Sequence, residues 1–345
     1  MNTGEMVGGY PRATAGPVRL DLNEAPHGAG VAFAKRVLEL LAAQPWNRYP
    51  EIDGSAARAA AAELYGWEVS GTLVGNGSNE LLAALVRALL PPGGTLARLA
   101  PSFSMYSEVA RRARARELEV RLDPPGFVAD GAQLVEAVGQ ADLALLASPN
   151  NPTGGVLPVE LMRRIAAFGK PTVWDGAYLE FAGLDPLPLL REFPNLIVLR
   201  SLSKAWGLAG LRVGALLTAP AMVARVSEQT LPFATGWLPL AAYRAATELR
   251  EASAALVADT VAERERQLAL LRRVAGVDVV PSAGNFYLLR VEGLAGQALA
   301  DSLRGRGIAV RYLEDLSSSG HVRVTVGAAG EGDALLAAVR EVAGR

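Results

Sequence analysis

The chain alternates short apolar runs with helical segments, and this alternation limits the folds open to it more than any other feature. The runs read ALLAS (144–148), PTVWD (171–175), NLIVLRS (195–201) and RVGALL (212–217), and turn-favouring residues bound them. Apolar runs of this length with helices between them are typical of buried, mostly parallel strands. The sequence therefore predicts an α/β domain with a mostly parallel central sheet flanked by helices.

Composition narrows the class of protein further. With 345 residues, of which 50% are hydrophobic, the chain is long enough for a large domain and a smaller one. A net charge of −1 argues against nucleic acid as the main partner. The chain has no cysteine and only two histidines, which excludes disulfides, thiolate chemistry and a histidine-rich metal site. A polar N-terminus and short apolar stretches predict a cytoplasmic protein with no membrane span.

The pattern of the sequence changes along the chain. The first thirty residues are rich in Gly, Pro and Ala and predict an arm. Ser55 is expected to cap an Ala-rich helix that Gly66 ends. Residues 240–276 read as one long helical tract, followed by the segments NFYLLRV (285–291), IAVRYL (308–313) and HVRVTV (321–326), which predict a C-terminal α+β unit. Helical spacing at 30–44 places four apolar residues on one side: Phe33, Val37, Leu38 and Leu41.

Lys204 is notable because lysine is rare in this chain. Of 34 Lys and Arg residues only Lys35, Lys170 and Lys204 are lysines, so 31 are arginines. In proteins lysine can lose its proton and act as an amine nucleophile, whereas arginine cannot. Lys204 also follows Ser201 and Ser203 at the end of a predicted strand, where ligands bind in open α/β sheets. This position predicts amine chemistry.

Polar segments follow other predicted strands as well. GNGSNE (75–80) opens a helix whose backbone N–H groups and dipole favour an anion. SPNNPTGG (148–155) offers amides, and VWDGAYLEF (173–181) offers a carboxylate at the end of a buried run. Taken singly, each segment also fits an ordinary turn, helix cap or core residue. Together with Lys204 and Arg212 they provide a phosphate cradle, an acid for a ring nitrogen, donors for a ring oxygen and one amine. These groups can hold pyridoxal 5'-phosphate as a lysine Schiff base.

In their order and spacing these segments resemble the fold-type-I pyridoxal-phosphate aminotransferases (class I/II), specifically the histidinol-phosphate aminotransferase branch. The motifs that carry the resemblance are LNEAPHG, NRYPEIDG, GNGSNELL, APSFSMY, SPNNPTGG, DGAYLEF, RSLSKAWGLAGLRVG and VRVTVG. The resemblance implies an aspartate-aminotransferase-like fold, with a large cofactor-binding domain at 31–245 and a small domain at 246–345. It also implies that the arm at 1–30 contributes to the small domain and to a dimer contact.

The resemblance implies roles for the residues that match these motifs. Lys204 would carry the cofactor and move a proton during the reaction. Asp175 would pair with the pyridine nitrogen, Tyr178 and Asn151 would bond the ring hydroxyl, and Phe103 would stack on the ring.

The resemblance also implies a phosphate site that two subunits share. Tyr49 would reach the phosphate site of a neighbouring subunit, so the protein would be a homodimer with shared active sites. The phosphate ligands implied within one chain are Gly77, Ser78, Asn79, Ser201, Ser203 and Arg212.

At the substrate end, the resemblance implies that Arg323 clamps a carboxylate, with Arg311 as a second candidate. Tyr10 would lie over the substrate, and Asn151 would contact it. No metal is implied.

Two departures from the family pattern concern the surroundings of the site. Gly176 stands where the family usually has Glu, and AAGEGD (328–333) replaces the usual residues after VRVTVG. The implied reaction is transamination between glutamate and imidazole acetol phosphate in histidine biosynthesis. Alternatives are a threonine-phosphate decarboxylase of cobamide synthesis or an aminotransferase for aromatic or other amino acids. Lys204 and Asp175 argue against a non-enzymatic regulator.

Overall fold

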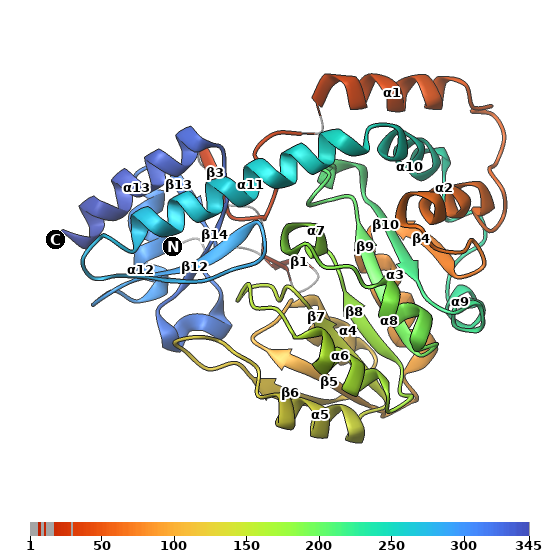
Figure 1. Ribbon diagram of the computed structural model, residues 1–345, viewed down its shortest axis with the longest axis horizontal. Coiled ribbons are helices and arrows are strands. Elements are labelled where there is room, and N and C mark those ends of the chain that lie inside the picture. Colours follow the sequence, from red (N-terminus) through yellow and green to blue (C-terminus); the bar gives the residue numbers. More distant parts are fainter. Residues whose placement is uncertain (1–5, 8–9, 12–16, 29, 345) are drawn as a thin grey trace.

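The computed structural model describes residues 6–7, 10–11, 17–28 and 30–344. A seven-stranded sheet lies at the centre of the larger part of the molecule, in the order β4-β10-β9-β8-β7-β5-β6 (Figure 1). Its strands are β4 (Thr72–Asn76), β5 (Thr95–Ala100), β6 (Arg116–Arg121), β7 (Leu143–Ala147), β8 (Thr172–Asp175), β9 (Leu196–Ser201) and β10 (Val213–Leu217). Strands β5 to β9 pair in parallel, and β10 is antiparallel to both of its neighbours.

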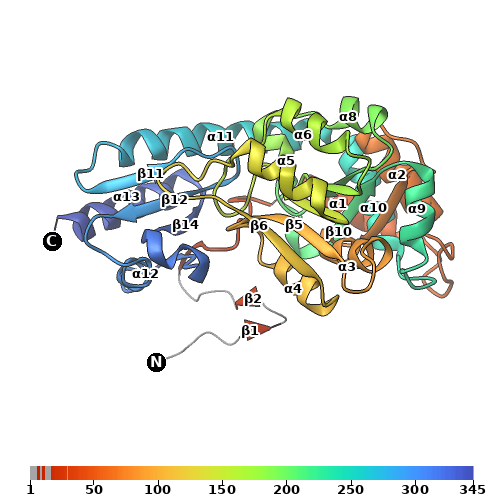
Figure 2. The same cartoon turned by 90° about the horizontal axis from the view of Figure 1, so that it is seen from below.

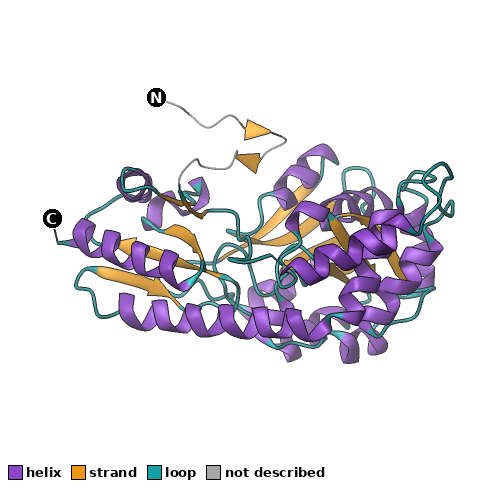
Figure 3. Ribbon diagram, turned by 90° about the horizontal axis from the view of Figure 1, so that it is seen from above, coloured by secondary structure: helices purple, strands orange, loops and turns teal. Residues whose placement is uncertain are grey.

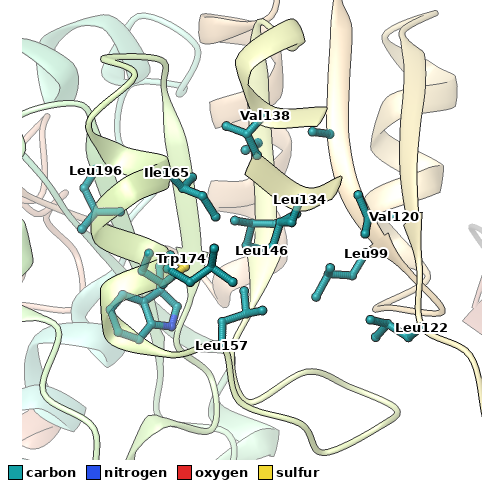
Figure 4. Packing of buried hydrophobic residues seen from close by; sticks show 14 of the residues in the cluster. Leu99, Val120, Leu122, Leu134, Val138, Leu146, Leu157, Ile165, Trp174 and Leu196 are labelled. Carbon is teal, nitrogen blue, oxygen red and sulfur yellow. The ribbon is translucent and has the colours of Figure 1, made fainter. Parts of the chain in front are cut away.

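Helices cover both faces of this sheet (Figure 3). They are α1 (Gly30–Ala42), α2 (Ser55–Tyr65), α3 (Ser78–Leu89), α4 (Met105–Arg112), α5 (Gly131–Gln140), α6 (Val159–Ala166), α7 (Leu179–Ala182), α8 (Leu187–Glu192), α9 (Pro220–Ser227) and α10 (Trp237–Glu248). Successive strand residues point to opposite faces. Leu146 packs with Leu134 and Ile165 on one face (Figure 4), and Leu145 packs with Leu81 on the other. Because both of their faces are buried, strands β7 to β10 read as apolar runs, whereas the edge strand β6 reads RELEVR.

A smaller part of the molecule is built on a three-stranded antiparallel sheet of β11 (Val277–Val280), β12 (Phe286–Val291) and β14 (Val322–Thr325). Helices α11 (Arg250–Leu271), α12 (Gly296–Arg304) and α13 (Ala329–Ala343) pack on it through one apolar cluster. Helix α11 crosses from the large sheet to the small one (Figure 1). The N-terminal β3 (Val18–Leu20) pairs in parallel with β13 (Ile308–Val310). Strands β1 (Met6–Val7) and β2 (Tyr10–Pro11) form a ribbon that lies apart from this body (Figure 2).

Three local predictions were wrong. Residues 240–276 form two helices, because the backbone breaks at Leu249 (φ −111°, ψ 31°) where α10, packed on α1 and α2, gives way to α11. Ser55 is the first residue of α2 and makes no capping bond, since Gly54 (φ 65°) takes the capping position. Leu38 is 65% exposed, because α1 packs along a narrow stripe that includes Phe33.

Gly66 does end α2, as predicted, and it adopts the left-handed conformation that glycine favours at this position. No helix within the described ranges is long and apolar enough to cross a membrane.

Candidate active site

A cavity of about 540 Å³ lies where β7, β8 and β9 end. Since these strands are parallel, the side chains that follow them meet at one edge of the sheet. Residues from the N-terminal segment and from α3 and α4 complete its walls. The lining residues are Leu22, Asn23, Glu24, Ser78, Asn79, Phe103, Met105, Arg112, Ala147, Asn151, Asp175, Ala177, Tyr178, Ser201, Ser203, Lys204, Ala209 and Arg212.

Lys204 lies in the cavity wall three residues after β9. Its Nζ donates to the Leu22 carbonyl oxygen at 3.0 Å. Burial, together with the positive charges of Arg323 and Arg212, lowers the pKa of Lys204 from 10.5 to about 7, against the opposing effect of Glu24. Near neutral pH a large fraction of this amine is therefore uncharged and nucleophilic.

Asp175 is the last residue of β8 and is 7% exposed. Its Oδ2 accepts from the Tyr106 hydroxyl at 2.7 Å, and its Oδ1 accepts from the Ala177 N–H at 3.1 Å. Burial raises the pKa of Asp175, while these two hydrogen bonds oppose the rise. Within the described ranges no cation forms an ion pair with Asp175. The carboxylate thus lacks the cationic partner that a buried charge requires.

A turn between β4 and α3 forms the opposite end of the cavity. Gly77 has φ 77°, and a Cβ on it would overlap the Arg212 guanidinium. Gly214 on β10 is equally constrained, because its Cβ would lie 2.5 Å from Ser78 N. Arg212 Nη1 donates to Ser203 Oγ at 3.4 Å. The N-terminus of α3, Ser201, Ser203 and Arg212 therefore all line the cavity, and together they favour an anion there.

Arg323 reaches this region from β14 in the small sheet. Its Nη1 donates to Asn151 Oδ1 at 2.7 Å, and its Nη2 donates to the Asp21 carbonyl oxygen at 2.5 Å. Arg311 is also buried and pairs with Arg323 through two backbone hydrogen bonds of 2.9 and 2.8 Å. Arg323 is thus linked to the cavity through the lining residue Asn151, and Arg311 lies beside it on the neighbouring segment.

Two aromatic residues with predicted roles, Tyr178 and Phe103, lie in the cavity wall. Tyr178 OH accepts from Asn23 Nδ2 at 3.0 Å, and its ring meets Phe286 edge-on at 5.0 Å between centroids. Phe103 also lines the cavity and meets the Tyr106 ring edge-on at 5.7 Å.

Besides Gly77, Arg323 and its neighbour Arg311, two further predicted residues are not among those that line this cavity. Tyr49 is 80% exposed and contacts Phe233, with 4.8 Å between ring centroids. Tyr10 belongs to β2, but its side chain lies outside what the structure describes. No cluster of three or more metal-binding side chains occurs in the described part of the chain.

Sequence reasoning missed several residues that the structure brings to the site. Asn23 and Glu24 belong to LNEAPHG, and Tyr106 belongs to APSFSMY, so both motifs were noticed but these side chains were given no role. Arg112 on α4 lines the cavity with its Nε bonded to Glu108 at 2.6 Å. Arg112 follows no strand, so no local signal indicated it.

Comparison with known proteins identifies the family. The model of the family described as aminotransferase class I and II matches residues 16–342. The chain belongs to this family of aminotransferases. A histidinol-phosphate aminotransferase from Thermococcus gammatolerans is 39% identical to this aminotransferase over 327 residues, which cover 95% of this chain and 92% of that protein.

Solved structures agree on the fold of this aminotransferase. The histidinol-phosphate aminotransferase from Sinorhizobium meliloti, in complex with pyridoxal-5'-phosphate, superposes with a TM-score of 0.86 at 26% identity, covering 95% of this chain and 91% of that one. A mutant of Thermus thermophilus aspartate aminotransferase gives a TM-score of 0.80 at 23% identity, covering 94% and 95%. The predicted family and the predicted aspartate-aminotransferase-like fold are both confirmed.

Proposed function

We propose that this aminotransferase uses pyridoxal 5'-phosphate to transfer an amino group from glutamate to imidazole acetol phosphate, giving histidinol phosphate in histidine biosynthesis. The observation that carries the proposal is the 39% identity with a histidinol-phosphate aminotransferase over nearly the whole of both chains. A cavity lined by the Lys204 amine, the buried Asp175 carboxylate and the groups that favour an anion supports it.

The residues present fit this cofactor. Asp175 is a buried carboxylate for which a protonated ring nitrogen is a suitable partner. The glycines at 77 and 214 allow β10 and Arg212 to pack closely against the turn at the start of α3, whose N-terminus favours an anion such as a phosphate. Ser78, Asn79 and Arg212 would bind the phosphate, with Gly77, Ser201 and Ser203 beside them. Phe103 would stack on the ring, and Asn151 and Tyr178 would bond its hydroxyl.

Each chemical role in the reaction falls to a side chain already described. Bound pyridoxal phosphate supplies an electrophilic carbon and a conjugated ring that takes up electrons when a bond to the substrate Cα breaks. The neutral Nζ of Lys204 would take the proton from that Cα and deliver it to the electrophilic carbon of the cofactor, and in the second half-reaction it would carry a proton the opposite way. Asp175 holds a positive charge at the far side of the ring, which favours electron uptake.

Arg323 is proposed to bind the anionic group of each substrate in turn. Its planar fork matches both the glutamate carboxylate and the phosphate of imidazole acetol phosphate. Asn151 orients this fork by accepting one of its N–H groups. Arg311 and Tyr10 are proposed as further substrate contacts.

We also propose that the protein is a homodimer in which Tyr49 completes the phosphate site of the partner subunit. Tyr49 contacts Phe233, whose N–H bonds to the Ile52 carbonyl oxygen, and Trp46 and Leu231 are exposed apolar residues within three positions of this group in the sequence; we call these five residues the 46–52 patch. Contiguous exposed apolar side chains of this kind mark interaction surfaces. We further propose that each chain divides into an arm (1–30), a cofactor domain (31–245) and a small domain (246–345).

A substrate panel tests the proposal. Purified protein reconstituted with pyridoxal phosphate is given histidinol phosphate with 2-oxoglutarate, an aromatic amino acid with 2-oxoglutarate, or threonine phosphate alone. We expect the highest kcat/KM with histidinol phosphate. Release of CO2 from threonine phosphate without turnover of histidinol phosphate would instead identify a decarboxylase, and a higher kcat/KM for the aromatic substrate would identify an aromatic aminotransferase.

A further inference from the structure

Asn23 connects three parts of the molecule through buried hydrogen bonds. Its backbone N–H donates to Thr325 Oγ1 at 2.9 Å, and its Nδ2 donates to Tyr178 OH at 3.0 Å. Its carbonyl oxygen accepts from Asn285 Nδ2 at 3.1 Å. Asn23 is 1% exposed and has φ 53°, a left-handed conformation that Asn and Asp tolerate better than most residues. The residue is therefore fixed in place at both its backbone and its side chain.

Thr325 decides which way the Asn23 amide faces. A backbone N–H can only donate, so Thr325 Oγ1 accepts a hydrogen bond from Asn23 N. The Thr325 hydroxyl in turn donates to Asn23 Oδ1 at 3.2 Å. Thr325 is buried, and within the described residues Asn23 Oδ1 is the acceptor of this proton. With the amide turned around, that hydroxyl would face Nδ2 and lose its acceptor, which is costly in a buried site. The Asn23 amide thus presents a pure donor to Tyr178.

This amide direction has a consequence for the Tyr178 proton. Because the phenolic oxygen accepts from Asn23, the Tyr178 O–H is directed as a donor toward another partner. Tyr178 lines the cavity together with Asp175 and Lys204, where the cofactor ring would lie. We propose that Asn23 is a positioning residue that fixes the Tyr178 hydroxyl as a hydrogen-bond donor to the ring oxygen of the cofactor and so favours the ionised form of that oxygen. This inference rests on the proposed function, since it takes pyridoxal phosphate as the ligand.

Asn23→Asp tests the direction of the hydrogen bond. Aspartate has nearly the same shape and tolerates the same backbone conformation, but its carboxylate can only accept. The carboxylate would accept a hydrogen bond from the Tyr178 hydroxyl and so leave the ring oxygen of the cofactor without that donor. The readout is a pH titration of the absorbance of the bound cofactor in purified holoenzyme. We expect the apparent pKa of that transition to rise by about one unit, the scale of one hydrogen bond.

Two uncharged variants of Thr325 separate the effect of hydrogen-bond direction from the effect of the negative charge that aspartate adds. Thr325→Val removes the group that orients the amide and adds no charge, so it should shift the titration in the same direction. Thr325→Ser keeps the hydroxyl and should titrate like the wild type. Asn285→Ala removes a bond of similar length to Asn23 but leaves the amide direction unchanged, so we expect a lower melting temperature and an unchanged titration. Asp175, Lys204, Tyr106 and Arg323 remain intact in every variant and thus contribute equally.

Opposite results would overturn the inference. It fails if Asn23→Asp and Thr325→Val both titrate like the wild type, or if Asn285→Ala shifts the titration as much as Thr325→Val does. Should Asn23→Asp not fold, the comparison of Thr325→Val with Thr325→Ser still decides. A wild-type protein that binds no pyridoxal phosphate would instead contradict the proposed function.

Discussion

At the residue scale, the low pKa of Lys204 has a cost for the cofactor-free protein. Between about pH 7 and pH 10.5 the unfolded state binds a proton that the folded state does not, so folded-state stability rises with pH in this window. Below pH 7 the folded state holds a buried ammonium and the full penalty applies. We expect Lys204→Met to be more stable than the wild type at pH 6 by at least ~1 kcal/mol, and the difference to shrink by pH 10. Urea unfolding of the cofactor-free proteins measures this.

The exposed Lys35 on α1 provides the control for that experiment. Lys35→Met should leave the pH dependence unchanged. A stability difference between Lys204→Met and the wild type that stays constant from pH 6 to pH 10 would show that Lys204 is not desolvated.

Tyr106 is expected to set the acid limit of activity through Asp175. Its hydrogen bond opposes the rise that burial causes in the pKa of Asp175. Tyr106→Phe removes that bond, so the pKa rises further and the carboxylate is lost at a higher pH as the solution is acidified. The acid limb of kcat against pH should move up by as much as about one unit. Tyr287→Phe, which removes a buried hydrogen bond to Gln267, should leave the limb in place.

Arg323 is expected to act on both half-reactions. Arg323→Lys replaces a fork by a point charge, so KM for glutamate should rise at least tenfold, given that an unpaired buried anion costs about 2–5 kcal/mol. Cofactor affinity should be unchanged, because Arg212 serves the other end of the cavity. Stopped-flow absorbance of each half-reaction measures the effect, with Arg290→Lys on β12 as control. If the glutamate half-reaction of Arg323→Lys is unaffected, Arg323 does not bind the substrate carboxylate and Arg311 becomes the candidate for that role.

At this scale, sequence patterns predicted the residues that carry distinctive chemistry and missed those that support them. Asp175 ends β8 and Lys204 follows β9, so strand prediction alone brings these two residues to one edge. Arg212 precedes β10 and reaches the same edge because β10 runs antiparallel to β9. Tyr106 and Asn23 reach their partners across 69 and 155 positions. No local pattern encodes contacts over such distances, because they depend on how the elements pack.

At the scale of elements, close packing between β10 and the start of α3 is expected to position the phosphate site. Gly214→Ala would push its Cβ against Ser78 N and Gly77 and so displace the turn. We expect cofactor affinity to fall at least tenfold, about 1.4 kcal/mol, with a smaller loss of stability. Gly210→Ala is the matched control, since a Cβ there meets nothing within 4 Å. Equal affinities for the two variants, measured by titrating cofactor-free protein, would contradict this role.

Strands β7 to β10 of the large sheet could be predicted, because each is buried on both faces and reads as an apolar run. Strands β5 and β6 were not predicted, since Arg98 interrupts β5 and the edge strand β6 reads RELEVR with several exposed side chains. The break at Leu249 could not be predicted, since no Gly or Pro marks it. It arises because α10 packs on α2 while α11 packs toward the small sheet. Strands β3 and β11 were missed because they are short and only partly apolar.

For the whole molecule, the 46–52 patch predicts an assembly of two chains. Wild-type protein should sediment at twice the chain mass. Trp46→Glu combined with Ile52→Glu should yield monomers that bind the cofactor more weakly, because Tyr49 of the neighbour is lost from the site. Val128→Glu, at an exposed valine outside the patch, should remain dimeric. Monomeric wild-type protein with full cofactor affinity would rule out a shared site.

The pairing of β3 with β13 also affects how the chain is made. Val18 and its partner Ile308 lie 290 residues apart (308 − 18). Strand β3 therefore leaves the ribosome early but cannot pair until β13, one of the last strands, has been synthesised. At translation rates of about 5–20 residues per second, that wait lasts roughly 15–60 s. Asn23 emerges early yet hydrogen-bonds to Thr325, which is synthesised near the end. Cofactor capture is therefore expected to follow release of the finished chain, and nascent chains stalled before β13 should depend on chaperones.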